Sequence, residues 1–234
     1  MYAHRNALYA DPSVRVVVLR GAGRAFCAGL DLQDNRGGEK AYDLSAAGPA
    51  EMLALQRRIS DIVMRMRRAP QPIVSLVQGA ACGGGFALAL ASDIRIAGES
   101  MKMNAAFIRI GLSACDIGVS YFLPRLVGVS VASELMMTGR FIHADRALRV
   151  GLVSEVAFDT DLEQVGTNYV DDMLATSPLS LRLTKECLNH NINVASLEAA
   201  IAMEDRNQVL CLHSADFQEG VAAFIEKRKP IYQD

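Results

Sequence analysis

The chain has 234 residues, of which 51% are hydrophobic and 21% are charged, and its formal net charge at pH 7 is −2. This composition is typical of a globular protein, and the balanced charge excludes a dedicated nucleic-acid binder, whose phosphate contacts require a strongly basic face. The polar start of the sequence and the absence of any run near ~18 apolar residues predict neither secretion nor insertion into a membrane.

The cysteines are odd in number and widely spaced, and they contain no CxxC pair. They are Cys27, Cys82, Cys115, Cys187 and Cys211. This spacing predicts neither a disulfide framework nor a structural zinc site. We therefore expect a cytoplasmic protein in a reducing compartment.

Strands and helices are predicted to alternate in the first half of the chain. Residues 14–21, "VRVVVLRG", form a β-branched run closed by glycine, which is typical of a strand buried on both faces. Residues 51–69 carry apolar side chains at helical spacing and predict an amphipathic helix that ends before Pro70. Residues 72–79, "PIVSLVQG", predict a second buried strand.

Helices dominate the later part of the sequence. Residues 86–92, "FALALAS", predict a tightly packed helix, and "DIRIA" and "MKMNA" predict two short strands after it. Further helical patterns are expected at residues 116–127, 130–137 and 144–150, and then over most of residues 161–229. This order predicts an α/β core at residues 1–157 followed by a helical region at residues 158–234.

A glycine-containing turn follows the first predicted strand. Its sequence, "GAGRAFCAGLDLQD", resembles a dinucleotide-binding turn, but Phe26 stands where that fingerprint needs its third glycine, and a polar loop replaces the helix. Nicotinamide binding is therefore a weak interpretation.

A second turn carries three consecutive glycines, at positions 83–85, and leads from a strand directly into a helix. A helix N-terminus presents unpaired N–H groups, and glycine lets a carbonyl oxygen approach the backbone closely. Such a turn can hold an oxyanion. Close packing of the helix on the strand explains the glycines equally well.

The two turns together resemble the crotonase family of enoyl-CoA hydratases and isomerases. The resemblance rests on "FCAGLDL" and on "PQPIVSLVQGAACGGG" about fifty residues later. It continues through "ASDIRIAG", "LPRLVG", "ELMMTGRFIHADRALRVGLVSEV" and "EGVAAFIEKRKPIY". It implies a spiral of strand-strand-helix units, followed by a C-terminal helical region that forms trimers and covers coenzyme A.

The resemblance also implies the residues of an active site. Backbone N–H groups of Leu30 and Gly84 would hold the thioester oxygen as it becomes an enolate, a form of catalysis that can supply several kcal/mol. Ala28 and Asp31 would contact the substrate in the same loop. Near the end of the chain, the implied coenzyme A contacts are Phe224 and Lys227.

Phe224 and Lys227 occupy "AFIEKRKP", which resembles the family's helix that encloses coenzyme A, often across a subunit boundary. A cationic side chain suits the phosphates of the ligand. A solvated basic helix end, favoured by the helix dipole, explains Lys227 almost as well.

The sequence departs from the family's hydratases at both positions where they carry catalytic glutamates. These positions correspond to Ala87 and Phe107, and neither side chain can activate water or deliver a proton. One acid remains nearby, Asp116, at a position where some isomerases of the family carry a catalytic carboxylate. The alternative is that Asp116 caps the helix that follows it.

Other polar residues fit structural roles better. Glu134 lies in a helix, Asp93 follows one, and His143 lies where a helix starts. Cys115 has no histidine partner placed by the sequence, and buried thiols are usually inert.

We therefore predict a crotonase-like α/β enzyme that transfers a proton on an enoyl or related acyl-CoA thioester, with isomerisation favoured. The alternatives are a hydratase or hydrolase in which Asp116 activates water, and a non-catalytic acyl-CoA-binding protein. No metal or redox cofactor is expected, and coenzyme A enters as part of the substrate. We expect a homotrimer or a dimer of trimers. Compared with the family, the sequence opens at the first helix, and two N-terminal strands are expected to be missing.

Overall fold

The structure of the protein, a computed structural model, describes residues 11, 13–31 and 47–233. The strands are β1 (Val17–Arg20), β2 (Ile73–Val77), β3 (Ala80–Cys82), β4 (Ile94–Gly98), β5 (Lys102–Asn104), β6 (Ile142–His143) and β7 (Glu155–Ala157). The helices are α2 (Pro49–Arg68), α3 (Gly84–Ala91), the 3-10 helix η2 (Ala106–Ile110), α4 (Val119–Thr138), α5 (Ala144–Arg149), α6 (Leu162–Leu174), α7 (Pro178–Asn191), α8 (Leu197–Leu212) and α9 (Ala215–Glu226). The helix expected at the start of the chain lies outside the described residues.

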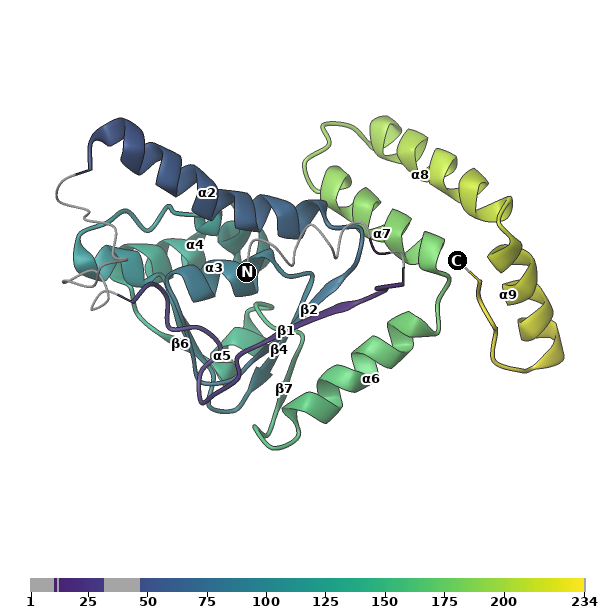
Figure 1. The fold of residues 1–234 in the computed structure, drawn as a ribbon, viewed down its shortest axis with the longest axis horizontal. Coiled ribbons are helices and arrows are strands. Elements are labelled where there is room, and N and C mark those ends of the chain that lie inside the picture. Colours follow the sequence, from purple (N-terminus) through teal and green to yellow (C-terminus); the bar gives the residue numbers. More distant parts are fainter. Residues whose placement is uncertain (1–10, 12, 32–46, 234) are drawn as a thin grey trace. The chain divides into compact units, whose positions relative to one another are not determined.

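The chain divides into two compact units. The strand-containing unit comprises residues 19–67 and 75–163. The helical unit comprises the described residues up to 18, residues 68–74 and residues 164–233, and it contains most of α6 and all of α7 to α9 (Figure 1). The functional boundary expected between residues 157 and 158 stays a prediction.

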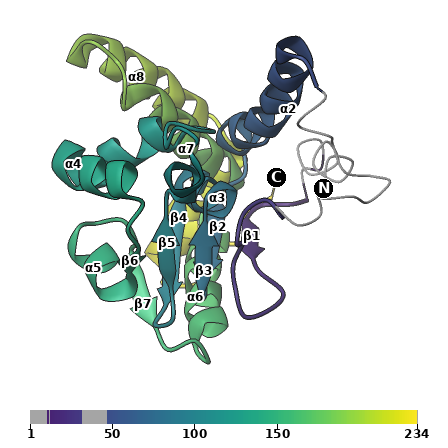
Figure 2. The same ribbon diagram turned by 90° about the vertical axis from the view of Figure 1, so that its left-hand side faces the viewer.

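The described strands form two sheets. One has the order β1-β2-β4-β7, and the other has the order β3-β5-β6. Strands β4 and β7 pair in parallel, as do β3 and β5, while β5 and β6 are antiparallel. Figure 2 shows the short strands of the second sheet beside the first. This mixed arrangement agrees with the predicted α/β class.

The expectation that the first strand is buried on both faces is wrong. In β1, partly buried and exposed residues alternate, and Val18 is 42% exposed. By contrast, every residue of β2 is buried. β1 stands first in the order of its sheet, and a β-branched run fits an edge strand as well as a central one. The β-branched run alone therefore could not show whether β1 lies at the edge or in the centre of the sheet.

The core of the strand-containing unit is built around α3. This helix is apolar on all sides, and its buried side chains include Phe86, Ala87 and Leu90. A helix without a polar face must be covered by other elements, and α3 contacts both α4 and β3 (Figures 1 and 2). The small residues of "FALALAS" make this close packing possible.

α4 contains a break at the place where the sequence predicted a gap between two helices. Gly128 has φ 76° and ψ 160°, which is not helical. The helix begins at Val119 rather than at residue 116, because Gly118 occupies its N-cap with φ 92°. The two predicted helices are thus confirmed, with a later start.

Serine caps open three helices of the helical unit. The side chains of Ser177, Ser196 and Ser214 each accept an N–H bond from the first turn of α7, α8 and α9 respectively. Such caps satisfy one of the unpaired N–H groups at a helix start.

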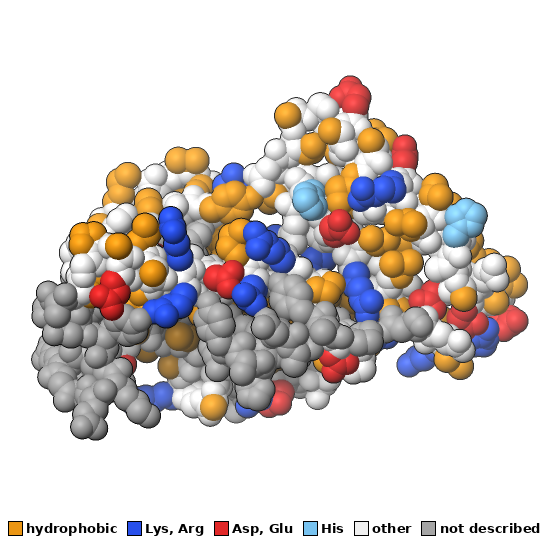
Figure 3. Space-filling model, turned by 45° about the horizontal axis from the view of Figure 1, so that its top comes forward, with side chains coloured by type: hydrophobic (Ala, Val, Ile, Leu, Met, Phe, Trp, Pro, Cys, Tyr) orange, Lys and Arg blue, Asp and Glu red, His pale blue; other side chains and the backbone are white. Residues whose placement is uncertain are grey.

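Figure 3 shows hydrophobic side chains among charged ones on the surface of these C-terminal helices. In the part of the chain that the structure describes, no helix is long and apolar enough to cross a membrane.

Candidate active site

The two glycine-containing turns lie against each other. The first turn continues as a short parallel bridge between Cys27 and Ala81 in β3. Three backbone bonds hold it there: Phe26 N–H donates to Gln78 O over 2.8 Å, Cys27 N–H to Ala80 O over 3.1 Å, and Cys82 N–H to Cys27 O over 3.0 Å. These bonds therefore hold the first turn, at residues 26–27, against the strand that leads into the second turn.

Several positions in these turns require glycine, and Gly85 and Gly29 lie where the two turns meet. A Cβ on Gly85 would lie 2.0 Å from the carbonyl oxygen of Cys27, closer than any side chain can approach. Gly29 has φ 99°, and a Cβ there would lie 3.1 Å from the carbonyl oxygen of Cys82 and 3.9 Å from the backbone nitrogen of Gly84. The close packing that the sequence left open is real, and it brings Gly29 beside the start of α3.

The start of α3 presents backbone N–H groups beside Gly29. Gly83 is the N-cap, and its own N–H donates to Asn104 O over 3.1 Å. The first N–H that donates within the helix belongs to Ala87, which bonds Gly83 O. The N–H of Gly84 precedes it and has no intrahelical acceptor, as expected for a first turn. The next loop residue after Gly29 is Leu30, whose side chain is 68% exposed.

Apolar side chains flank this helix start. A Cβ on Gly83 would lie 3.5 Å from a ring atom of Phe107, and a Cβ on Gly84 would lie 3.9 Å from Cδ1 of Ile117. Ala87 is completely buried in the core. Ala87 and Phe107, the residues expected at the hydratase glutamate positions, therefore lie close to the triple glycine, and both are apolar.

Asp116 lies immediately before Ile117 in the chain, in the turn that precedes α4. Its Oδ1 accepts the N–H of Ile117 over 2.8 Å, and its backbone carbonyl accepts the N–H of Val119 over 2.9 Å. The N-cap of α4 is Gly118, and no side chain caps this helix. The alternative that Asp116 serves as the helix cap is therefore wrong.

Two features of this turn were not predicted from the sequence. The side-chain amide of Gln56, in α2, donates to Oδ1 of Asp116. Ile117 has φ 35°, a left-handed conformation that is rare for a β-branched residue. Gln56 stands sixty residues from Asp116 on an exposed part of an amphipathic helix, so no local pattern marks it. The glycine after Ile117 is the only local signal of an unusual turn.

Two of the other polar residues considered from sequence, Glu134 and Asp93, form ion pairs. Glu134 forms a bidentate ion pair with Arg146, at 2.8 and 2.7 Å, and the hydrogen bonds from Arg146 lower its pKa. Asp93 lies 3.1 Å from Arg67. His143 is the N-cap residue of α5 without a side-chain cap bond. Cys115 is exposed, and the five cysteines, all within the described residues, are unpaired.

A cavity of ≈ 850 Å³ opens beside the first turn. Ala28 lines it, together with three cationic residues, Arg20, Arg24 and Lys102, and Arg20 pairs with Glu163 over 2.7 Å. This volume lies in the range of small-molecule sites. Among the residues that the structure describes, no cluster of three or more His, Cys, Asp or Glu side chains is arranged to hold a metal ion.

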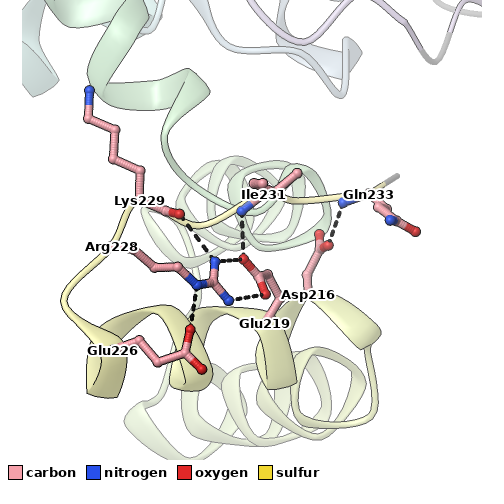
Figure 4. Close-up of polar contacts among 7 residues, drawn as sticks. All are labelled: Asp216, Glu219, Glu226, Arg228, Lys229, Ile231 and Gln233. Atoms are coloured by element: carbon pink, nitrogen blue, oxygen red, sulfur yellow. Dashed lines mark hydrogen bonds and ion pairs between the residues drawn. The ribbon is translucent and has the colours of Figure 1, made fainter.

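Phe224 and Lys227 belong to the helical unit. Phe224 is 85% exposed, and Lys227 is the C-cap of α9 with φ 55°. The residue after Lys227 is held firmly: Arg228 donates to both oxygens of Glu219, over 2.5 and 2.9 Å, and to Glu226 over 2.6 Å (Figure 4). Glu219 also accepts the N–H of Ile231 over 2.7 Å. Glu219 therefore holds the residues that follow α9 against that helix.

The strand-containing unit is thus an α/β structure in which two glycine-dependent turns lie against each other. Apolar side chains flank the start of α3, and a carboxylate lies in the turn that precedes α4. The profile of one family, described as enoyl-CoA hydratase/isomerase, matches residues 4–234. The chain belongs to this family, which is a family of enzymes.

Comparisons with individual proteins agree. The chain is 40% identical over 225 residues to a Mycobacterium tuberculosis protein named probable enoyl-CoA hydratase EchA12, covering 96% of this chain and 78% of that protein. It is 34% identical to the 1,2-epoxyphenylacetyl-CoA isomerase of Escherichia coli, over 95% of this chain and 82% of that protein.

Among solved structures, an enoyl-CoA hydratase from Bacillus anthracis has a TM-score of 0.90 at 32% identity, over 99% of this chain and 86% of that chain. The resemblance to crotonases and the predicted fold class are therefore confirmed.

Proposed function

We propose that the protein isomerises an enoyl-CoA or related acyl-CoA thioester by proton transfer. The observation that carries this choice is the apolar surrounding of the triple glycine, with Phe107 against Gly83 and Ala87 buried behind it. Hydration needs one group to activate water and another to protonate the α-carbon. Neither side chain can do this, which leaves Asp116 as the candidate acid and base.

In this mechanism, the N–H groups of Leu30 and Gly84 donate to the thioester oxygen. Asp116 removes a proton from one carbon of the acyl chain, and the electron pair of the broken C–H bond moves into the enolate. The same carboxyl group then returns the proton to a different carbon. Each fixed N–H donor is worth about 3 kcal/mol to the enolate-like transition state. The closeness of Gly29 to the Gly84 nitrogen supports the pairing of these donors.

The coenzyme A part of the substrate is assigned to two regions. Ala28 and Asp31 would contact it in the first turn, where the cationic side chains of the neighbouring cavity suit its phosphates. Phe224 and Lys227 would contact it at the end of α9. The substrate brings coenzyme A with it, and the proposal uses no metal and no redox cofactor.

The assembly proposed for the protein is a homotrimer or a dimer of trimers. The exposed apolar side chains of the helical unit, such as Leu197 and Ile225, support a surface that is covered by other subunits. The unpaired cysteines support a reducing, cytoplasmic location.

A paired assay tests the proposed reaction. Wild type and Asp116→Asn are incubated with 2-enoyl-CoA, 3-enoyl-CoA and dienoyl-CoA thioesters of several chain lengths in deuterated buffer, and products are read by mass spectrometry. We expect isomerised or deuterated thioester from the wild type, a loss of about 10²- to 10⁴-fold in Asp116→Asn, and binding within a few-fold of wild type.

Other outcomes would point to the alternatives. A hydrated or hydrolysed product that disappears in Asp116→Asn would identify a hydratase or hydrolase that uses Asp116 to activate water. Binding of the thioesters without product or deuterium exchange would identify a non-catalytic acyl-CoA-binding protein. Full activity in Asp116→Asn would remove Asp116 from the mechanism.

A further inference from the structure

The carboxylate of Asp116 has two oxygens with different surroundings. Oδ1 accepts the N–H of Ile117 and the side-chain amide of Gln56. Among the residues that the structure describes, no donor is placed on Oδ2. Because an ionised carboxylate only accepts hydrogen bonds, Gln56 must present its NH2 group to Oδ1. One oxygen is therefore engaged, and the other is free to exchange a proton.

The backbone of this turn is fixed independently of Gln56. Ile117 and Gly118 have positive φ values of 35° and 92°, and the Asp116 carbonyl accepts the N–H of Val119. A β-branched residue keeps such a conformation only where its surroundings determine it. Here the Ile117 side chain reaches the helix start at Gly84. The main chain thus sets the position of Asp116, and two donors orient its carboxylate: the N–H of Ile117 and the side-chain amide of Gln56.

We propose that Gln56 is a positioning residue for Asp116, which holds Oδ1 so that Oδ2 takes and returns the substrate proton. This inference rests on the proposed function. The C–H bond of the substrate breaks and an O–H bond forms at Oδ2, while the electron pair passes into the enolate. In the second half of the reaction the O–H bond breaks and a new C–H bond forms. Gln56 neither gains nor loses a proton.

A glutamine suits this role because its amide is neutral. It restricts the carboxylate to one orientation without adding a second charge beside it. An arginine or lysine would tie the carboxylate into an ion pair, and a leucine would leave the N–H of Ile117 as its one remaining donor among the described residues. Catalysis by proton transfer depends on such orientation, since the base must lie within hydrogen-bond reach of the carbon-bound proton.

Four variants test the proposal on the thioester that the wild type converts fastest. Gln56→Leu removes the donor at similar size, Asp116→Asn removes the base, and the double variant combines both. Arg57→Ala is the matched control, because it truncates the neighbouring exposed side chain on the same helix. We expect Gln56→Leu to lower kcat by about 10- to 100-fold with KM nearly unchanged. The double variant should be no slower than Asp116→Asn alone.

The outcomes distinguish the proposed role of Gln56 from the proposed isomerase function. If Asp116→Asn is inactive while Gln56→Leu keeps the wild-type kcat, the proposed function stands and the role of Gln56 is refuted. If Gln56→Leu and Arg57→Ala lower kcat equally and both lower the melting temperature, Gln56 serves the helix and not the carboxylate. If the wild type gives no isomerisation and no deuterium exchange, both proposals fail. A kcat effect confined to Gln56→Leu and absent on the Asp116→Asn background supports the proposal.

Discussion

At the scale of single residues, the site depends on atoms that a side chain would displace. Gly85 allows the first turn of α3 to lie directly on the carbonyl of Cys27, where an added Cβ would approach within 2.0 Å. The same contact holds the turn that carries Leu30 beside the turn that carries Gly84. We therefore expect Gly85 to be needed for the stability of the fold and for the alignment of the two proposed N–H donors.

Gly85→Ala should destabilise the protein and impair catalysis together. Overpacking in a fixed core typically costs about 1–3 kcal/mol, and here the obstacle is backbone rather than a flexible side chain. Gly23→Ala is the control, because a Cβ at Gly23 meets no atom within 4 Å. Urea denaturation of both variants gives the free energies of unfolding. Equal stability of the two variants would show that the α3 start can shift to accept a side chain.

That the two turns meet was implied by the resemblance to the crotonase family, because the glycines alone left close packing and an oxyanion site equally open. The glycines at positions 29 and 83–85 mark close backbone approaches, and the structure has such approaches at Gly29 and Gly85. The partnership of Gln56 and Asp116 was beyond sequence reasoning, because many polar side chains share the exposed face of α2 and no periodicity selects one. The orientation of the carboxylate depends on that partner.

At the scale of elements, charged side chains hold the chain in place after the end of α9. After the left-handed Lys227 the chain turns back along α9, and Glu219 holds it by accepting bonds from Arg228 and from the N–H of Ile231 (Figure 4). These bonds, first from Arg228 and then from Ile231, lower the pKa of Glu219 from 4.5 to about 2. The hydrogen bonds that Arg228 donates to Glu219 and then to Glu226 raise the pKa of Arg228.

This pair predicts a pH dependence of stability. Because the pKa of Glu219 is lower in the folded chain, its contribution is fully present above pH 4.5 and is lost as the pH falls towards about 2. Melting temperatures of wild type and Glu219→Gln should therefore differ at pH 7 and converge in acid. Asp205→Asn, at an exposed position of α8, is the control and should differ little from wild type at either pH. A constant gap between wild type and Glu219→Gln across this range would contradict the assignment.

Elements with strong local patterns were predicted, and those that depend on distant partners were missed. The amphipathic α2 and the apolar α3 were both expected within two residues of their bounds. The short strands β3, β6 and β7 were not predicted, because each is defined by its pairing with a distant strand. Strand β7, for example, pairs with β4, where Glu155 lies opposite Ile96. Two or three residues carry too little periodicity to indicate a strand. For the same reason the edge position of β1 was misjudged.

At the scale of the whole molecule, the helical unit has more apolar surface than its helices need for packing on one another. Leu197 and Ile201 share one face of α8 at i and i+4 spacing, and both are exposed. Ile225 in α9 is exposed as well. Single exposed apolar residues are ordinary, but several on adjacent helices of one unit are typical of an interface.

We therefore expect light scattering after size-exclusion chromatography to give the mass of three or six chains. Replacing Leu197 and Ile201 together by aspartate should lower that mass if the shared face of α8 is covered in the assembly, because unpaired charges are costly in a buried interface. Circular dichroism checks that the helices persist in the double variant. A wild-type mass of one chain across micromolar concentrations would refute the trimer.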